Sequence, residues 1–357
     1  MDRQAVARFG LIGCGAIGSR LDEDAVGDVA LTHASAVQRA TGAELVAVCD
    51  NDAARAAACG RRRNVGRVYA DYREMLTAER LDAVSIATPP VDRLKMIEAA
   101  LDHGVRLVWC EKPMAASLSE ARAIERRVGR GRAIFAVNYI RRWTATARRM
   151  ASLVKSGQLG EPQGGAVYYG KGLLNNGSHA IDLLGLLFGQ PDTVEAIARV
   201  ADDRAEGDET LTGTLHYRRP QGAFSVQLIG TDHRRYSLFE IDLLFEGGRL
   251  RLTEKGNRLE VQTVAEDPVF PGYRALRVEE TLAGDLSTAF DEVLAQLLAV
   301  RRGRDRAPFC GAADGLGALA VVEGLRRSWQ TSRPVATSER GPTAAAWAPR
   351  SLGFAIS

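Results

Sequence analysis

Residues 8–18 read RFGLIGCGAIG, and this stretch decides the fold. Its apolar run ending at Ile12 predicts a buried β-strand, and three glycines follow with the GxGxxG spacing. Such glycines permit a tight turn, let a dinucleotide pyrophosphate approach the backbone, and let the next helix pack on the strand. Because the motif stands after a predicted strand and before a predicted helix, we expect a dinucleotide to be bound by Gly13, Gly15, Ala16, Ile17 and Gly18.

A carboxylate follows the second apolar run, which ends at Cys49. At the end of a strand, Asp50 is placed to accept hydrogen bonds from the adenosine ribose and to repel a 2′-phosphate, which favours NAD over NADP. Asp50 stands further beyond Gly18 than the usual ~20 residues, so we expect an insertion around Leu21–Ala30. The alternative interpretation is a turn residue that caps the helix from Asn51, and the two roles are compatible.

Short apolar runs alternate with amphipathic stretches through the first 140 residues. Continuous apolar strands separated by helices are typical of a parallel sheet covered on both faces, and the right-handed crossover rule favours the doubly wound Rossmann topology of α/β proteins. The strands are predicted at Phe9–Ile12, Leu45–Cys49, Val68–Tyr69, Ala83–Ala87, Arg106–Cys110 and Ile134–Val137, with helices that include Val91–His103 and Leu118–Val128.

The pattern changes after about residue 160, where β-rich stretches follow one another with few helices between them. This order predicts a C-terminal α+β domain with a large, mostly antiparallel open sheet. We assign residues 1–140 to the Rossmann domain, 141–335 to a substrate and oligomerisation domain, and 336–357 to a loose tail. The predicted strands are Gly165–Tyr169, Val194–Val200, Glu209–Tyr217, Ala223–Leu228, Tyr236–Phe245, Arg249–Leu252 and Leu259–Thr263, and the predicted helices are Thr144–Ser156, Ser178–Phe188, Ser287–Val300 and Ala312–Ser328.

Two further strands of the Rossmann domain end in residues that we expect near the cofactor, because ligands of open α/β sheets lie beyond the carboxyl ends of the strands. Thr88-Pro89 follows the fourth strand, although the proline also suits a purely structural strand end. Glu111 and Lys112, followed by Pro113, end the fifth. A lysine serves as acid or base when burial or a nearby positive charge, such as an oxidised nicotinamide, lowers its pKa. On composition alone a surface lysine is the alternative, but the strand-end position favours catalysis.

The composition argues against several other classes of protein. A net charge of +3 gives no case for nucleic-acid binding, and no run approaches the ~18 apolar residues of a membrane helix. The five cysteines are scattered without a CxxC pair, which argues against a disulfide framework or a metal site and is typical of a reducing cytoplasm. The N-terminus lacks the pattern of a signal peptide. Arginine clusters such as Arg61–Arg63 are interpreted as solvated helix ends.

The order and spacing of these motifs, from about residue 8 to about 335, resemble the Gfo/Idh/MocA family of oxidoreductases. Ala313-Asp314-Gly315, Val322–Arg327 and Ser332-Arg333-Pro334-Val335 are similar to the family's closing helix. Besides the glycine turn and Asp50, the resemblance is carried by Ala87-Thr88-Pro89, Glu111-Lys112-Pro113, Val137-Asn138-Tyr139 with Arg141-Arg142-Trp143, and Gly177-Ser178-His179-Ala180-Ile181-Asp182-Leu183-Leu184.

The resemblance implies that Lys112 is the catalytic lysine, with Pro113 often in cis, and that His179 is the active-site histidine. The family's usual aspartate four residues before this histidine is Asn175 here. Asparagine cannot titrate but can bind a sugar hydroxyl. Asparagine at this position is similar to the variant of some nucleotide-sugar dehydrogenases of the family, and this resemblance favours a sugar substrate. Asp182, three residues beyond His179, is placed to orient the imidazole if the segment is helical. A core histidine is the alternative for His179.

Further residues complete the predicted site. Asn138 and Arg142 are expected to contact substrate, a solvated loop being the alternative for Arg142. The family's open sheet often forms an oligomer interface, so we expect a homodimer or homotetramer. The remaining histidines are interpreted as structural or surface residues: His33, His103, His216 and His233.

These expectations describe a cytoplasmic NAD-dependent oxidoreductase, without a metal, that interconverts a secondary alcohol and a ketone on a sugar, cyclitol or nucleotide sugar. Lys112 acts as acid/base and His179 bonds the reacting oxygen or relays the proton. One alternative is a non-catalytic sensor of NAD or sugar, against which the presence of both residues argues. Others are an imine- or biliverdin-reducing enzyme and a glycosidase that oxidises its substrate transiently.

Overall fold

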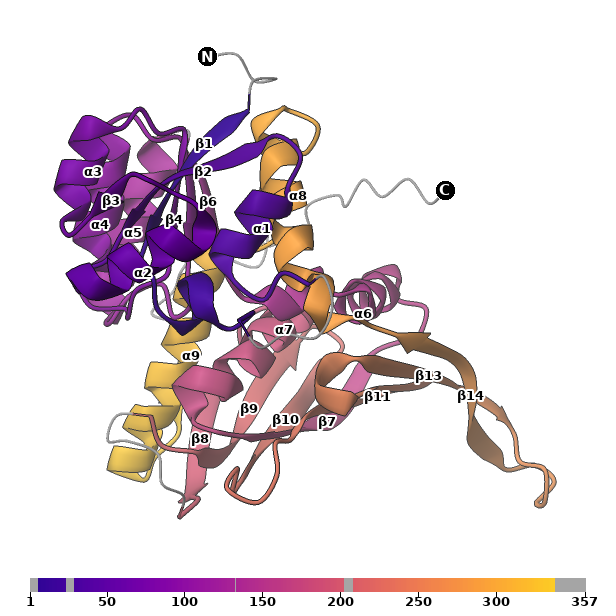
Figure 1. Ribbon diagram of the computed structural model, residues 1–357. Helices are drawn as coiled ribbons and strands as arrows, with labels where there is room; N and C mark the ends of the chain where they lie inside the picture. The colour runs from indigo at the N-terminus through magenta and orange to yellow at the C-terminus, as the bar shows by residue number, and fades with distance from the viewer. Residues whose placement is uncertain (1–5, 24–28, 132, 202–207, 338–357) are drawn as a thin grey trace. The chain divides into compact units, whose positions relative to one another are not determined.

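The computed structural model describes residues 6–23, 29–131, 133–201 and 208–337. These residues form two compact units, each built on one sheet (Figure 1). The first comprises the described chain up to Thr144 together with Asp285–Leu319, and the second comprises Ala145–Gly284 and the described chain from Ala320. The predicted tail, residues 336–357, lies outside the described residues from position 338 on.

The first unit is the predicted Rossmann domain. Its described strands form one six-stranded parallel sheet in the order β3-β2-β1-β4-β5-β6. Helices α1 and α8 pack on each other, and α4 packs against both α3 and α5 (Figure 1). The strands are β1 Ala7–Ile12, β2 Ala43–Cys49, β3 Val68–Tyr69, β4 Ala83–Ile86, β5 Leu107–Cys110 and β6 Ile134–Val137; the helices are α1 His33–Arg39, α2 Ala53–Arg63, α3 Tyr72–Ala78, α4 Arg93–Asp102, α5 Leu118–Arg130 and α8 Ala289–Arg301.

The segment after the glycine motif differs from the prediction of a helix. Ala16–Arg20 forms a five-residue π turn, and α1 begins only at His33. The predicted insertion around Leu21–Ala30 falls between them, and its residues 24–28 lie outside the described residues. Thr32 starts α1 by accepting a hydrogen bond from the Ser35 N–H at 3.2 Å. A local cap, rather than the glycine motif, therefore sets the start of this helix.

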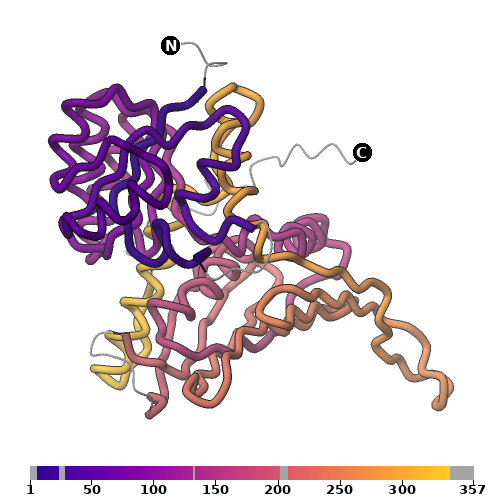
Figure 2. The backbone as a smooth tube through the Cα atoms, viewed as in Figure 1, coloured from indigo at the N-terminus to yellow at the C-terminus, as the bar shows by residue number. Residues whose placement is uncertain are grey.

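Residues 285–319 pack in the first unit, although the sequence assigned them to the second domain. In Figure 2 the orange helix α8 runs beside the indigo helix α1. Phe290 of α8 places its ring centroid 5.4 Å from that of His33 and 5.7 Å from that of Trp109. Burial of these rings against the sheet explains why α8 belongs to this unit.

The second unit is the predicted α+β domain. Its nine described strands have the order β14-β13-β12-β11-β7-β10-β9-β8-β15, antiparallel except for the pair β7 and β10. Helix α6 packs on α7, and α9 begins in the first unit and continues in the second. The strands are β7 Pro162–Gly170, β8 Thr193–Arg199, β9 Leu211–Arg219, β10 Gly222–Thr231, β11 Phe239–Phe245, β12 Gly248–Thr253, β13 Arg258–Glu266, β14 Arg274–Ala283 and β15 Val335–Ala336; the helices are α6 Ala145–Ser156, α7 Ser178–Phe188 and α9 Ala312–Thr331.

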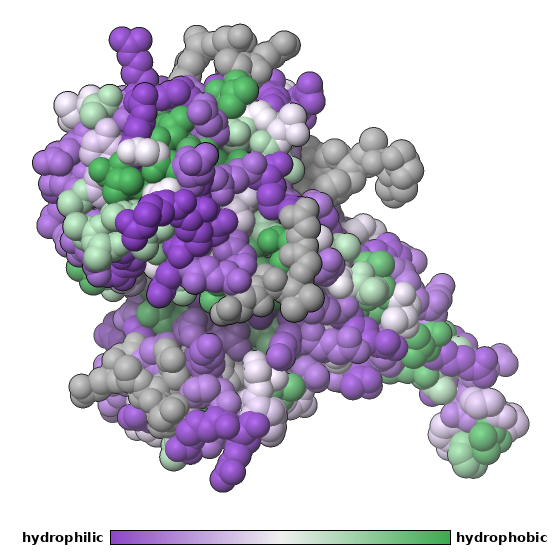
Figure 3. Space-filling model, viewed as in Figure 1, coloured by the Kyte–Doolittle hydropathy of each residue, from purple (hydrophilic) through white to green (hydrophobic). Residues whose placement is uncertain are grey.

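The sequence did not predict β14. None of its residues is buried, and its pairing with β13 passes from Glu280 to Val278, which leaves Glu279 as an extra residue. Exposed apolar side chains gather at the tip of the β13–β14 hairpin (Figure 3): Val269, Phe270 and Tyr273. None of the helices in the described ranges combines the length and apolar composition that a membrane crossing requires.

Candidate active site

The glycine turn after β1 is shaped by packing at its two ends. Gly13 has a φ of +98°, and a Cβ there would lie 2.8 Å from the carbonyl carbon of Ala87. A Cβ on Gly18 would lie 2.0 Å from the carbonyl oxygen of Gly13. A side chain at either position would collide with backbone, so protein packing alone requires both glycines.

Gly15 stands in the same turn without such neighbours. A Cβ built there meets no atom within 4 Å among the described residues. Its φ of −71° is also open to other residues, so neither packing nor conformation explains a glycine at this position. Open space beside the main chain at the end of β1 fits a ligand that must approach the backbone closely, as the pyrophosphate of NAD does.

Asp50 follows β2 and ties this strand to the glycine turn. Its Oδ2 accepts a hydrogen bond from the Cys14 N–H at 2.8 Å, and its Oδ1 accepts one from the Asp52 N–H at 3.0 Å. The Arg55 Nε lies 3.4 Å from Oδ1. Asp50 therefore acts as a turn residue before α2, and each carboxylate oxygen keeps a lone pair for a further donor such as a ribose hydroxyl.

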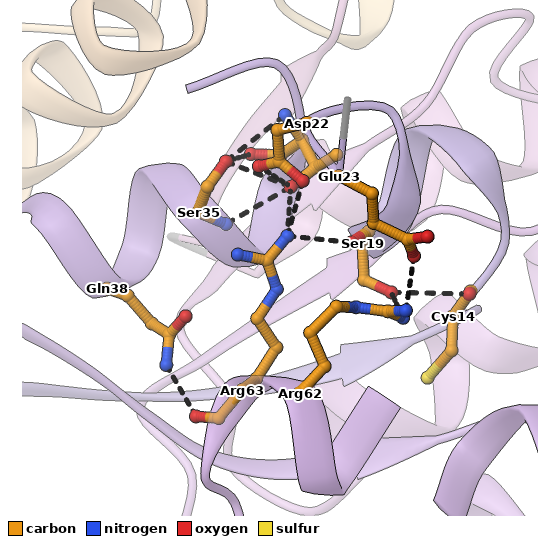
Figure 4. A network of polar contacts seen from close by, with 9 residues as sticks. Cys14, Ser19, Asp22, Glu23, Ser35, Gln38, Arg62 and Arg63 are labelled. Carbon is orange, nitrogen blue, oxygen red and sulfur yellow. Dashed lines mark hydrogen bonds and ion pairs between the residues drawn. The ribbon is translucent and has the colours of Figure 1, made fainter. Parts of the chain in front are cut away.

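Two arginines of α2 hold the described ends of the insertion (Figure 4). The Arg63 Nη2 lies 2.5 Å from the Asp22 Oδ1 and donates to the Ser19 carbonyl at 2.6 Å. Arg62 pairs with Glu23 and donates to the Ser19 Oγ at 3.0 Å. Arg61 and Arg62 are exposed in the last turn of α2, as a solvated helix end predicts. Arg62 and Arg63 in addition tie α2 to the segment that follows the glycine turn.

The carboxylate of Asp22 is the centre of this cluster. Burial raises the pKa of Asp22. Hydrogen bonds from the hydroxyls of Ser35 and Thr32 and the charge of Arg63 together outweigh this effect, so the pKa lies below its usual value. Asp22 is therefore ionised whenever the unit is folded near neutral pH.

One buried arginine connects the ends of β4 and β5. Arg93, the first residue of α4, is 2% exposed. Its Nη2 donates to the Thr88 carbonyl, and its Nη1 donates to the carbonyls of Glu111 and Pro113. Lys112 lies between these last two residues, its side chain is half-buried, and the Lys112–Pro113 peptide bond is cis. The main chain on both sides of the lysine is thus bound to a single guanidinium.

The carboxylate of Glu111 points into the unit. Its Oε1 lies 3.1 Å from the His33 Nε2 and accepts a hydrogen bond from the Asn138 Nδ2, while Oε2 accepts one from the Lys112 N–H at 3.1 Å. Burial raises the pKa of Glu111, but the bond with His33, the amide of Asn138 and the Lys112 charge lower it below its usual value. The sequence assigned Glu111 to the cofactor; the structure instead uses its side chain to fix the loop that carries Lys112.

A buried network surrounds this carboxylate. The His33 Nδ1 bonds the Ser85 Oγ, and the His33 ring lies 4.1 Å from that of Trp109. The Trp109 Nε1 donates to the Asn138 Oδ1 at 3.0 Å. Because a carboxylate only accepts, the His33 Nε2 carries the proton. Asn138, expected to contact substrate, uses both of its side-chain polar atoms to support Glu111 and Trp109.

Arg142 was also expected to contact substrate, but its side chain is buried in the first unit. It follows β6 in the 3₁₀ turn Ile140–Trp143. Its Nη1 donates to the Phe309 carbonyl at 3.0 Å and lies 3.1 Å from the Asp314 Oδ1. This buried ion pair gives the guanidinium a structural partner at the start of α9.

The second unit carries Asn175 and His179, the other two residues predicted to contact substrate. Asn175 lies in the π turn Leu173–Gly177, which runs directly into α7, where His179 is 7% exposed. The Asn175 N–H donates to the Asp208 Oδ1 at 3.3 Å, so Asp208 helps to hold this turn. The segment is continuously helical, and the spacing of Asn175, His179 and Asp182 therefore places them on one side of it.

The Gfo/Idh/MocA family model, described as an oxidoreductase family with an NAD-binding Rossmann fold, matches residues 7–139. This stretch of the chain is therefore similar to the NAD-binding domain of that family. The resemblance inferred from the motifs is confirmed, and NAD is the cofactor that this domain binds in the family.

Relatives and solved structures extend the likeness. The D-apiose dehydrogenase of Paraburkholderia graminis is 29% identical over 197 residues, which span 50% of this chain and about half, 52%, of that relative. The inositol 2-dehydrogenase of Rhizobium meliloti is 25% identical over 348 residues, which span 92% of this chain and 98% of the relative. An oxidoreductase from Agrobacterium radiobacter, solved with NAD+, L-tartaric acid and magnesium, has the same fold with a TM-score of 0.76 at 21% identity, covering 93% of this chain and 99% of that one.

In the Rossmann unit the predicted cofactor residues gather at one edge of the sheet. Strands β1, β4 and β5 are parallel neighbours, so the residues after their carboxyl ends stand next to one another: the glycine turn, Thr88-Pro89 and Lys112. A Cβ on Gly13 would lie 2.9 Å from the Thr88 nitrogen, and Arg93 connects Thr88 to both neighbours of Lys112. The open space at Gly15 lies in this edge.

The sequence predicted a structural or surface role for His33, which is buried here, but it did not predict that His33 and Arg93 hold the segment around Lys112. His33 is separated from Glu111 by 78 residues, and no sequence pattern connects such distant partners. One feature of the sequence could have pointed to Arg93. A cation at the first position of a helix is disfavoured by the helix dipole, so an arginine there indicates that its side chain has a specific partner.

Proposed function

We propose that this protein is an NAD-dependent oxidoreductase that interconverts a secondary alcohol and a ketone on a sugar, cyclitol or nucleotide sugar. The observation that carries the proposal is the single sheet edge at which the glycine turn, Thr88 and Lys112 follow neighbouring strands. The relatives named as D-apiose dehydrogenase and inositol 2-dehydrogenase support a polyhydroxylated substrate.

The proposed roles follow from the chemistry of each group. NAD, when bound, accepts or returns hydride at the nicotinamide ring. The N–H groups of Gly15, Ala16 and Ile17 bind the pyrophosphate, and Asp50 binds the ribose hydroxyls and disfavours NADP. Thr88 and Pro89 form the wall next to the nicotinamide.

Lys112 is the proposed acid/base and also contacts substrate. It removes the proton of the hydroxyl that is oxidised and returns it in the reverse reaction. His179 is proposed to hydrogen-bond the reacting oxygen, and Asn175, which cannot titrate, to bind a neighbouring hydroxyl of the substrate.

Lysine substitution tests the proposal. With NAD and a panel of D-apiose, myo-inositol and a UDP-sugar, Lys112→Ala is expected to lower kcat by about 10²–10⁴-fold, the usual contribution of general acid–base catalysis, and to leave NAD affinity nearly unchanged. Lys95→Ala, on an exposed lysine of α4, is the matched control and should keep wild-type turnover. His179→Ala should lower kcat less than Lys112→Ala.

Two outcomes would contradict this function. Wild-type turnover in Lys112→Ala would remove the lysine from the reaction. Tight NAD binding by the wild-type protein without turnover of any panel member or related polyol would favour a sensor of NAD or sugar.

A further inference from the structure

Arg93 is a buried cation with no carboxylate partner among the described residues. Its guanidinium donates to the carbonyl oxygens of Thr88, Glu111 and Pro113. Its Nε has no hydrogen-bond partner in the described part of the chain. Carbonyl dipoles therefore offset its charge only in part, and a buried charge of this kind costs free energy.

The position of Arg93 in its helix adds to this cost. As the first residue of α4 it lies at the positive end of the helix dipole, where a cation is disfavoured. The nearby carboxylate of Asp92 binds Lys95 at 2.6 Å instead. The fold thus maintains an un-neutralised cation at the point where β4 and β5 end, and such an arrangement calls for a function.

We propose that Arg93 is a positioning residue for Lys112: it binds the carbonyls on both sides of the lysine and, through its fixed positive charge, favours the unprotonated amine. The inference rests on the proposed acid/base function of Lys112. Both carbonyls next to Lys112 bind Arg93, so the buried charge lies beside the main chain of the lysine. A second positive charge near a buried cation is disfavoured, and this favours the unprotonated amine. Arginine suits this task because its guanidinium stays charged at working pH and offers several donors in one plane.

The other ionisable groups around Lys112 act differently. The negative charge of Glu111 favours the protonated amine of Lys112 and so opposes the effect of Arg93. This negative charge is partly offset by hydrogen bonds that the carboxylate accepts from His33, Asn138 and the Lys112 main chain. Burial raises the pKa of Cys110 to about 11, although the Arg93 charge lowers it, so this thiol is neutral near pH 7. The charge of Arg93 therefore works against that of Glu111.

Titration of the lysine amines tests the charge effect without any substrate. The chain contains five lysines, so reductive methylation with ¹³C-formaldehyde gives few NMR signals, and Lys112→Arg identifies the signal of Lys112. Arg93→Gln removes the charge and keeps donors, whereas Arg93→Lys keeps the charge as long as the new lysine, whose own methyl signal reports its protonation, stays protonated. We expect Arg93→Gln to raise the pKa of the Lys112 amine by about 1 pH unit, the scale of a nearby-charge effect, and Arg93→Lys to leave it unchanged.

The positional part of the inference has its own measurement. One ammonium cannot reach three carbonyls in the geometry of a guanidinium, so Arg93→Lys is expected to lower kcat about 10-fold or more while NAD affinity and the Lys112 pKa are kept. Lys95→Gln, which removes an exposed cation from the same helix, is the control and should change neither kcat nor the Lys112 pKa.

Equal Lys112 pKa values in Arg93→Gln and Arg93→Lys would overturn the inference. If Arg93→Gln does not fold by circular dichroism, Arg93→Met replaces it as the neutral variant. If neither neutral variant folds, Arg93→Lys provides the test. An unchanged pKa of the Lys112 amine with a reduced kcat supports the inference. A shifted Lys112 pKa or a wild-type kcat overturns it.

These results are distinguishable from a failure of the proposed function. Wild-type turnover in Lys112→Ala removes the acid/base function and leaves the titration result intact. An inactive Lys112→Ala together with equal pKa values in the two Arg93 variants overturns only the effect of Arg93.

Discussion

At the scale of single residues, the carboxylate of Glu111 connects three segments that are distant in sequence. His33 reaches it from α1, Asn138 from the end of β6, and Lys112 through its own main chain. The result is a proposed catalytic loop whose geometry depends on a histidine that does not take part in the chemistry. A partner lost from this network leaves a buried carboxylate short of donors.

His33→Leu tests this dependence, because leucine fills much of the same space and offers no N–H to Glu111. We expect the variant to lose about 1–3 kcal/mol of unfolding free energy at pH 7, the usual cost of an unsatisfied buried group. Urea unfolding followed by circular dichroism measures this loss. His103→Leu, on an exposed histidine at the end of α4, is the control and should stay within about 0.5 kcal/mol of wild type; equal stability of both variants would contradict the expectation.

Asp22 makes stability depend on pH. Its pKa is lowered in the folded state, so its ionised form stabilises the fold above the unfolded pKa, and this contribution disappears as the pH falls through the folded pKa. Asp22→Asn should therefore be less stable than wild type at pH 7 by about 1–2 kcal/mol, with the difference shrinking towards pH 3. Unfolding curves at several pH values measure this, with the exposed Glu74→Gln as the control; a difference that grows in acid would refute the sign.

At the scale of elements, each of the six strands of the first sheet was predicted, because a sheet covered on both faces is made of continuous apolar runs. The edge strand β14 was missed because it buries no residue and therefore shows no apolar face. The π turn at Ala16–Arg20 was missed because an insertion separates the glycine motif from the helix that such a motif normally begins.

The arrangement of the candidate site was predictable to the extent that its residues follow strand ends. Asp50, Thr88 and Lys112 could be placed because parallel strands bring their carboxyl ends to one edge. Side-chain partners across elements could not be predicted, since the contacts of His33 and Arg93 depend on which helices and loops the topology brings together.

In the glycine turn, Gly13 is required by packing, whereas Gly15 is proposed to serve ligand binding. Gly13→Ala should destabilise the protein strongly, because its φ is positive and its Cβ would collide with the backbone of Ala87. Gly15→Ala should unfold like wild type, since its Cβ meets open space, and should lose NAD affinity. Thermal unfolding and isothermal titration with NAD measure the two effects; wild-type NAD affinity in Gly15→Ala would contradict the proposed pyrophosphate site.

At the scale of the whole molecule, the first unit is discontinuous in sequence, because Asp285–Leu319 returns to it after the chain has built most of the second unit. The returning helix α8 binds through several contacts: Phe290 lies against the rings of His33 and Trp109, and Asp291 lies 3.4 Å from Arg39. The domain that carries the glycine turn is therefore complete only with residues that follow most of the second unit in sequence.

Truncation tests this dependence. A chain that ends at Gly284 should be insoluble or fail to bind NAD, because the apolar ring cluster around Trp109 loses its cover. A chain that ends at Thr337, which removes only residues outside the described ranges, is the control and should bind NAD like the full chain. A soluble 1–284 fragment with full NAD affinity would show that α8 is dispensable.

The return of α8 also has a consequence for synthesis in the cell. Translation delivers all six described strands of the first sheet long before the ribosome reaches residue 289, so the nascent domain waits with His33 and Trp109 uncovered while strands β7 to β14 of the second sheet emerge. During that interval chaperones have a defined apolar surface to bind, and the dinucleotide-binding domain is finished only after its C-terminal neighbour has largely been made.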